Sequence, residues 1–218
     1  AQEVSPALFG PGSGDARKRA ECSGDCEVFQ ACVTRASLDE PWGMSFDVSD
    51  GVAVCVSSLS DNSAAPVQVY NDTAPEANKL KVGDYILEAD GARGDADKIA
   101  DVLRRVMVTS LKIRRPMLAT HKISKQGKSM GLELQFGVSS SALCLLKVHD
   151  GVVKASGVDM RAGDHIVRVN GAEGTGKDLL AIMKQADPIE ITVSRCLEVS
   201  EAYRNGFVPH QMSSAGDG

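Results

Sequence analysis

The chain contains the same pattern twice, at an offset of 80 residues. The stretch Leu80-Lys-Val-Gly-Asp-Tyr-Ile-Leu-Glu-Ala-Asp-Gly91 aligns without a gap with Met160-Arg-Ala-Gly-Asp-His-Ile-Val-Arg-Val-Asn-Gly171. The match continues downstream, where Ile99, Leu103, Leu111, Ile113 and Arg115 correspond to Leu179, Met183, Ile191, Val193 and Arg195. Repetition of this kind predicts two copies of one folding unit. The 218 residues are enough for two such units, since small domains need about 75 to 100 residues each.

The composition allows a hydrophobic core in both units. Hydrophobic residues make up 43% of the chain but aromatic residues only 4%, so we expect cores of Val, Leu, Ile and Met. The net charge of -5 argues against a general nucleic-acid-binding protein. Basic residues nevertheless concentrate in one region, which predicts either a solvated face and connector or a surface for an anionic partner or lipid. These residues are Arg104, Arg105, Lys112, Arg114, Arg115, Lys122, Lys125 and Lys128.

The sequence leaves the compartment open. No stretch approaches the roughly 20 apolar residues that a membrane-spanning helix needs, and no signal peptide is recognisable. The first residue is Ala1 rather than Met, which fits a removed targeting segment as well as a piece of a longer product. We expect a soluble protein, cytoplasmic or organellar, with a plastid and peripheral membrane association both compatible with the sequence.

The six cysteines fall into two groups. Three lie in apolar, strand-like runs and are expected to be buried free thiols: Cys55, Cys144 and Cys196. Three cluster near the N-terminus, where a disulfide is an open alternative: Cys22, Cys26 and Cys32. Their spacing is not a recognised zinc pattern and no His lies nearby to complete four ligands. The sequence therefore predicts no metal site and no cofactor.

Composition and periodicity divide the chain into five segments. They are an N-terminal arm with a short helix within Asp15–Arg35 (1–39), unit one (40–116), a basic linker (117–127), unit two (128–196) and a C-terminal tail (197–218).

Each unit is predicted to hold about five short strands and two helices. In unit one the strands are expected at 43–48, 52–56, 84–89 and 110–114, and the helices at 63–70 and 95–106. In unit two the strands are expected at 132–136, 142–148, 164–169 and 189–194, a turn or helix at 154–160 and a helix at 177–186. The predicted fold class is α+β, mainly β, with each unit a small, partly open β-barrel capped by two helices.

The repeated core resembles the PDZ family pattern Leu-x-x-Gly-Asp-x-Ile-Leu-x-Val-Asn-Gly. A second mark of that family, an apolar-Gly-apolar loop, stands at Trp42-Gly43-Met44 and again at Met130-Gly131-Leu132. The resemblance covers both units and leaves the arm, the linker and the tail outside. It implies two tandem PDZ-like domains.

In the PDZ family an extended peptide adds as a strand beside the second strand, in a groove walled by the second helix. Amide groups of the apolar-Gly-apolar loop receive the terminal carboxylate, because a glycine lets successive N–H groups converge on one anion. The resemblance implies two carboxylate loops, Trp42, Gly43 and Met44 in one unit and Met130, Gly131 and Leu132 in the other. It implies groove walls formed by Phe46, Ile99, Val102 and Leu103 and by Leu134, Leu179, Leu180 and Met183.

The sequence departs from the family pattern at several positions. Many members carry a His at the start of the second helix, where this chain has Ala96 and Gly176. The first Gly of the usual loop is replaced by Pro41 and Ser129, and a proline removes a donor. We expect a shorter helix and a shallower groove, so that either unit binds internal segments or acts as a docking block without an occupied groove. Trp42 is either a ligand anchor or a cap on the barrel edge.

Other residues with chemical potential have structural interpretations. The segment 171–178 imitates a phosphate-binding loop, but Asp178 stands where a Ser or Thr would hold magnesium. Asp84 and Asp164 each follow a Gly before a strand, which is typical of turn capping rather than acid–base catalysis. The histidines share no spacing: His121, His149, His165 and His210. No catalytic cluster emerges, and the chain is predicted not to be an enzyme.

Two functions follow from these observations. The first is a scaffold with two PDZ-like domains that bind extended peptide segments of protein partners, not nucleic acid. The second is a structural subunit of a large complex, for example a photosynthetic complex at an organellar membrane, which docks through its terminal arms and domain surfaces. A third, the peptide-sensing part of a protease, would need a protease domain that the sequence does not contain.

Overall fold

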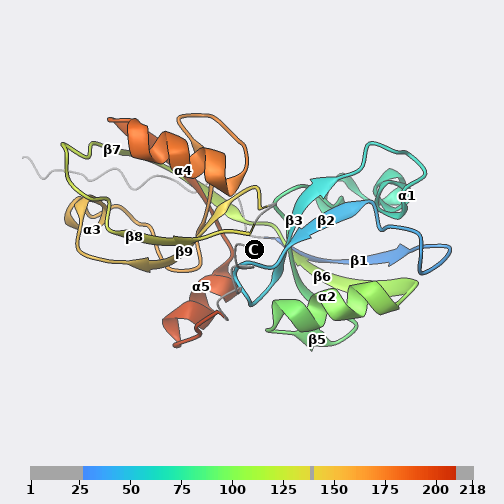
Figure 1. The fold of residues 1–218 in the computed structure, drawn as a ribbon. Coiled ribbons are helices and arrows are strands. Elements are labelled where there is room, and N and C mark those ends of the chain that lie inside the picture. The colour runs from blue at the N-terminus through green and yellow to red at the C-terminus, as the bar shows by residue number, and fades with distance from the viewer. Residues whose placement is uncertain (1–26, 138–139, 210–218) are drawn as a thin grey trace, which may run out of the picture.

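The computed structural model of the chain describes residues 27–137 and 140–209, which form two antiparallel sheets (Figure 1). Sheet one has the order β1-β6-β4-β3-β2, with β5 beside β4, and sheet two has the order β7-β11-β10-β9-β8. The strands of sheet one are β1 (Val28–Thr34), β2 (Met44–Asp47), β3 (Val54–Leu59), β4 (Tyr85–Ala89), β5 (Ala92–Arg93) and β6 (Val108–Arg114). Those of sheet two are β7 (Met117–Ile123), β8 (Leu132–Gln135), β9 (Leu143–Val148), β10 (His165–Val169) and β11 (Ile189–Arg195).

Short helices accompany both sheets. They are α1 (Pro66–Thr73), the 3-10 helix η1 (Glu76–Asn78), α2 (Ala96–Arg105), α3 (Val152–Ala155), α4 (Gly176–Gln185) and α5 (Leu197–Arg204). Neither sheet closes on itself, and the predicted mainly β, α+β class with partly open sheets is confirmed. No helix within the described ranges is long and apolar enough to span a membrane.

Two segments have a structure that the sequence analysis did not predict. The prediction of a helix before residue 35 is wrong where the structure describes it, because 28–34 form β1 and pair along the whole of β6. Phe29, Ala31 and Val33 are buried and the residues between them are exposed, which is the two-residue period of a strand. The predicted linker is likewise wrong in its first part, since β7 pairs with all of β11.

The remainder of the predicted arm, including Cys22 and Cys26, lies outside the described residues. Cys32 is a free, exposed thiol on β1. Of the three cysteines expected to be buried free thiols, Cys144 and Cys196 are buried and Cys55 is half-buried.

The repeated Gly-Asp motif forms the same turn in both units. Oδ2 of Asp84 accepts a hydrogen bond from the Lys81 amide at 2.9 Å, and Oδ2 of Asp164 accepts from the Arg161 amide at 2.8 Å. The side chain therefore closes a short turn before the strand, and the predicted turn-capping role is confirmed.

The same two aspartates also bind equivalent arginines at the ends of β6 and β11. Nε of Arg195 lies 2.7 Å from Oδ1 of Asp164, and Nε of Arg115 lies 3.2 Å from Oδ1 of Asp84. Asp164 is fully buried and Arg195 nearly so, which makes this ion pair one of the most enclosed charge pairs of the fold. Burial raises the pKa of Asp84, and the hydrogen bond from Arg115 opposes that effect.

Each long helix is capped by the residue before it. The side chain of Asp95 accepts from the Lys98 amide at the start of α2. Thr175 accepts from the Asp178 amide at the start of α4, and the Asp178 carboxylate accepts from the Thr175 amide, which completes a capping box. The segment 171–178, which resembles a phosphate-binding loop in sequence, thus forms the N-terminus of α4. The Thr175 and Asp178 amides there already donate to the chain's own side chains.

The two sheets meet at equivalent positions of the repeat. Tyr85 and His165 are exactly one repeat apart, and the Tyr85 hydroxyl lies 2.7 Å from Nδ1 of His165. Cys55 pairs with Tyr85 across strands, and Cys144 pairs with His165 in the same way. In an interface with two-fold symmetry, both partners use the same surface patch, so equivalent residues meet at the axis. The two units therefore pack with pseudo-two-fold symmetry. In Figure 1, α2 and α4 accordingly lie on opposite sides of the molecule.

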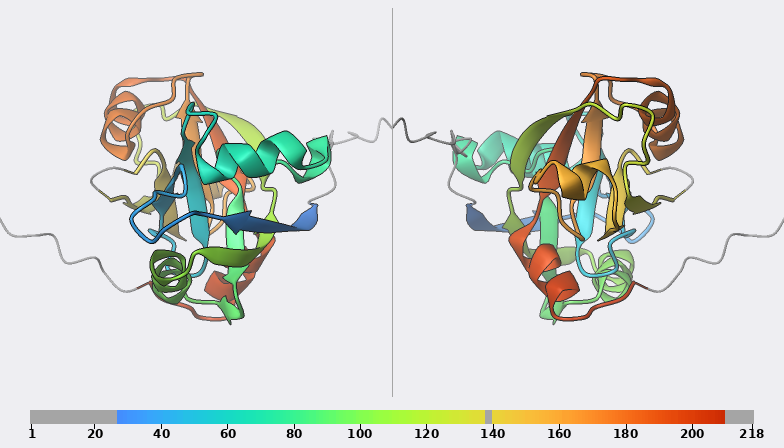
Figure 2. Two further views of the ribbon diagram at one scale, coloured as in Figure 1. Left: turned by 90° about the vertical axis from the view of Figure 1, so that its right-hand side faces the viewer. Right: turned by 90° about the vertical axis from the view of Figure 1, so that its left-hand side faces the viewer.

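Helix α5 breaks this symmetry, because it lies beside the junction of the two sheets (Figures 1 and 2). Val199 and Cys196 pack with Tyr85 and Val52 in a small separate core. The Glu198 carboxylate accepts a hydrogen bond from Nε of Arg114 on β6 at 2.8 Å.

Candidate functional site

The strands β2 and β8 each stand at the end of their sheet. Each pairs with one strand only, so that among the described residues the other edge has no strand beside it. Both strands are four residues long, and α2 and α4 are ten residues each. A ten-residue helix is about 15 Å long, which matches about four residues of an extended strand.

The structure brings the predicted groove residues of each unit into one hydrophobic cluster. In unit one, Ile99 and Leu103 are fully buried, whereas three side chains stay half-buried: Met44, Phe46 and Val102. In unit two, Leu179 and Met183 are buried, whereas four stay half-buried: Met130, Leu132, Leu134 and Leu180. Only the half-buried side chains retain surface that a ligand could cover.

The predicted loop glycines have the backbone that only glycine adopts without strain. Gly43 has φ +76 and Gly131 has φ +73. There is also no space for a side chain, because a Cβ at Gly131 would lie 2.8 Å from the His149 carbonyl oxygen and one at Gly43 2.6 Å from the Ala65 Cβ. The loops are therefore fixed tightly against their own units.

Trp42 lies inside the core of unit one rather than on its surface. The indole is 5% exposed and donates from Nε1 to the Leu103 carbonyl at 2.7 Å. The Arg35 guanidinium lies 4.6 Å from the indole ring centroid. Of the two roles expected for Trp42, these contacts correspond to the cap, since the indole has almost no surface left to offer a ligand.

A basic side chain binds the C-terminal carbonyls of the second helix in both units. Arg35 donates to the Leu103 and Arg104 carbonyls at 3.3 and 2.9 Å. Lys125 donates from Nζ to the Met183 and Lys184 carbonyls at 3.0 and 3.1 Å. A cation at this end offsets the negative end of the helix dipole, next to the loop that is proposed to receive a carboxylate. Sequence reasoning placed both residues outside the units, so this feature was missed.

The opposite end of each helix is tied to the turn after the edge strand. The Ala96 amide donates to the Gly51 carbonyl at 3.1 Å, and the Gly176 amide donates to the Ser140 carbonyl at 2.8 Å. A Cβ at Gly176 would lie 2.8 Å from the Cβ of Phe136, so the helix touches the end of the edge strand there. These contacts hold the first turn of each helix against the segment that follows the edge strand, and the depth of the groove stays a prediction.

Titratable groups gather at the junction of the sheets, but they lack the features of a nucleophilic site. Burial raises the pKa of Cys55 well above its usual range and that of Cys196 to about 12. A reactive cysteine requires the opposite, a lowered pKa and access. Within the described residues, no group of three or more His, Cys, Asp or Glu side chains is placed to hold a metal ion.

Comparison with known proteins gives matches among solved structures alone. No family model and no curated protein matches the chain. Among solved structures, the complex of INAD PDZ45 with NORPA CC-PBM is 15% identical, with a TM-score of 0.34, over 78% of this chain and 91% of that chain. INAD PDZ45 in complex with NG2 peptide is 17% identical, with a TM-score of 0.32, over 89% of this chain and 95% of that chain. Because both TM-scores lie below 0.5, we base the fold on the strand order and the repeated contacts.

Proposed function

We propose that the chain is a non-enzymatic interaction protein whose two PDZ-like units bind extended peptide segments of protein partners by strand addition. The observation that carries the proposal is that β2 in sheet one and β8 in sheet two each have one edge without a neighbouring strand among residues 27–137 and 140–209. Half-buried apolar side chains lie on each of these strands and on the second helix of its unit. An edge strand offers unpaired backbone groups to an added strand. The half-buried side chains supply the apolar contacts that select it.

Unit two is the stronger candidate of the two. In unit one the loop residue Trp42 is bound to the helix carbonyl of Leu103 and covered by Arg35. Its counterpart in unit two, Met130, stays half-buried and has a flexible side chain that can move aside. Binding of a peptide at the β8 edge therefore requires less displacement of the unit's own side chains than binding at the β2 edge.

The first test is selection of peptides with the full chain. Peptides with free C-termini are displayed as a library, and those recovered are titrated by calorimetry together with their C-terminal amides. For peptides that bind at the β8 edge, we expect Leu180→Lys on α4 to weaken binding at least tenfold and Val102→Lys on α2, which alters the groove of unit one instead, to leave it within twofold. Loss of binding by the amide would place the carboxylate at a loop. Failure to recover any binding peptide, or recovery of peptides insensitive to both variants, would contradict the proposal.

A second function, a docking block in a larger assembly, is favoured by the closed environment of Trp42 and by the packing of both units around α5. The two functions are separated by pull-down with the full chain and with residues 27–209 alone. Truncation at residue 26 preserves β1, whose Phe29, Ala31 and Val33 belong to the core. Partners retained by 27–209 bind the units themselves, whereas partners lost with the termini support the docking role.

A further inference from the structure

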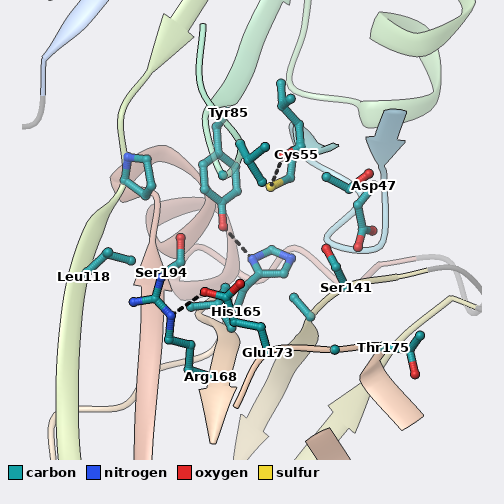
Figure 3. Close-up of a pocket in the computed structure, with 18 residues that line it drawn as sticks. Asp47, Cys55, Tyr85, Leu118, Ser141, His165, Arg168, Glu173, Thr175 and Ser194 are labelled. Carbon is teal, nitrogen blue, oxygen red and sulfur yellow. Dashed lines mark hydrogen bonds and ion pairs between the residues drawn. The ribbon is translucent and has the colours of Figure 1, made fainter. Parts of the chain in front are cut away.

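A cavity of about 500 Å³ lies between the two sheets, next to the contact of Tyr85 with His165 (Figure 3). Its lining shares only Asp47, the last residue of β2, with the two edge strands β2 and β8, and the proposed strand addition does not use it. Its size is within the range of about 300 to 1,000 Å³ typical of small-molecule sites.

The wall of this inter-sheet cavity is mainly apolar. Val56, Val82, Pro116, Leu118, Ala142 and Val167 contribute to it. Two of these side chains are also unusually exposed, Val82 at 60% and Leu118 at 55%. Exposed apolar side chains grouped around a cavity are typical of a binding site.

The cavity exists because the two units are covered differently. On sheet one, Val199 of α5 and Cys196, the residue before this helix, pack against the face that carries Tyr85. The equivalent face of sheet two carries His165, Ser194 and Leu118, which are neighbours across β10, β11 and β7. Helix α5 also reaches sheet two, where the Tyr203 hydroxyl lies 3.7 Å from Cys144 Sγ, but no α5 residue lines the cavity beside His165, Ser194 and Leu118.

Two polar groups on this face lack hydrogen-bond partners within the described part of the chain. Ser194 is 3% exposed and its Oγ is unpaired, and His165 is 2% exposed and its Nε2 is unpaired. Nδ1 of His165 is already bound to the Tyr85 hydroxyl. Buried polar atoms are nearly always satisfied in proteins. Nε2 of His165 faces the Asp50 carboxylate, so Ser194 Oγ is the buried atom that a group from outside the chain would satisfy.

The charged side chains at the wall are already matched. Nε of Arg168 donates to the Glu173 carboxylate, and the Asp47 carboxylate accepts from the Ser49 amide and the Ser140 hydroxyl. His165 faces the carboxylate of Asp50 at 4.0 Å. An anionic ligand would meet no cationic side chain of the lining that lacks a carboxylate partner, and desolvation would disfavour a charged ligand of either sign.

We propose that the inter-sheet cavity binds a small, uncharged, largely apolar molecule with one hydrogen-bonding group. Its apolar body lies against Val82, Leu118 and Val167, and its polar group bonds to Ser194, with His165 beside it. The site is formed by both units together, so it exists only in the intact chain.

The probe for this site is 2-naphthol, a flat apolar molecule with a single hydroxyl that is neutral at pH 7. Binding to the full chain is measured by saturation-transfer NMR and by calorimetry. Ser194→Ala should weaken binding about fivefold, as expected for the loss of one neutral hydrogen bond of about 1 kcal/mol. Leu118→Trp should reduce it at least tenfold by filling the cavity. The matched control Val69→Trp places the same side chain at a 54% exposed position on α1 and should change nothing.

Thermal unfolding of each variant verifies that it is folded, and both tested positions lie outside the edges proposed for peptides. No saturable binding below 10 mM by the full chain, or equal loss in the Leu118 and Val69 variants, would overturn the proposal. Binding that appears only when residues 1–26 are removed would also overturn it, because the chain's own N-terminal segment would then be the occupant.

Discussion

The stability of this protein should fall as pH rises through the range in which His165 loses its proton. Burial alone disfavours the charged imidazole, but the Cys144 sulfur and the carboxylates of Asp50 and Asp47 outweigh it and raise the pKa of His165 to about 9. In the unfolded chain the pKa returns to about 6.5. The folded state therefore binds a proton more tightly than the unfolded state.

The magnitude follows from the difference between these two pKa values. One pKa unit corresponds to about 1.4 kcal/mol, so the protonated imidazole contributes about 3 kcal/mol, fully present below pH 6.5 and lost as pH passes 9. Between pH 6.5 and 9 we expect the free energy of unfolding to decrease by about 2 to 3 kcal/mol. Burial lowers the pKa of His121 instead, so that group affects stability below this range and not within it.

The assay is urea unfolding followed by circular dichroism at constant ionic strength, at several pH values from 6.5 to 9. His165→Gln should flatten the pH dependence, whereas His149→Gln, which removes a half-exposed imidazole paired with Glu133, should keep it. If His165→Gln does not fold, an NMR titration of the imidazole in the unmodified chain gives the pKa directly. Equal pH dependence in the unmodified chain and the His165 variant, or an imidazole pKa near 6.5, would refute the reasoning.

Two further predictions concern the stability of unit two. Gly131→Ala should destabilise the chain by about 2 kcal/mol more than Gly157→Ala, because both have positive φ but only Gly131 also meets backbone atoms within 3 Å; equal midpoints in urea would count against the close approach. Arg195→Met should cost about 3 to 5 kcal/mol by leaving the buried Asp164 unpaired, whereas Arg161→Met, at an exposed pair, should cost less than about 1 kcal/mol. Thermal denaturation measures the stability of both variants. A similar loss of stability in Arg195→Met and Arg161→Met would contradict the idea that burial makes the Asp164 pair more important.

Features held by short-range contacts were predictable from the sequence. The Gly-Asp turns were identified because Asp84 and Asp164 bind amides three residues away. The fold class followed from the repeated strand periodicity. The groove residues were placed on the correct strands and helices, although their role in peptide binding stays a prediction.

Features held by distant contacts could not be predicted in this way. Val28, Phe29, Cys32 and Val33 fit a helical face as well as a strand, and only the pairing of β1 with β6, about 80 residues later, decides between them. The position of Trp42 depends likewise on the Leu103 carbonyl, 61 residues away. Without knowledge of these distant contacts, the sequence does not distinguish a helix from a strand at 28–34, or a ligand anchor from a cap at Trp42.

The meeting of Tyr85 with His165 has a consequence for how many ligands one molecule can hold. Two separate copies of one unit, joined around the same axis, would have to bring an identical residue against itself and would form matching surfaces on both sides. Joining the copies in one chain removes that requirement, so a phenol can face an imidazole, and a single helix can cover one side only. The inter-sheet cavity therefore does not need a symmetry-related copy, and we expect a stoichiometry of one small molecule per chain.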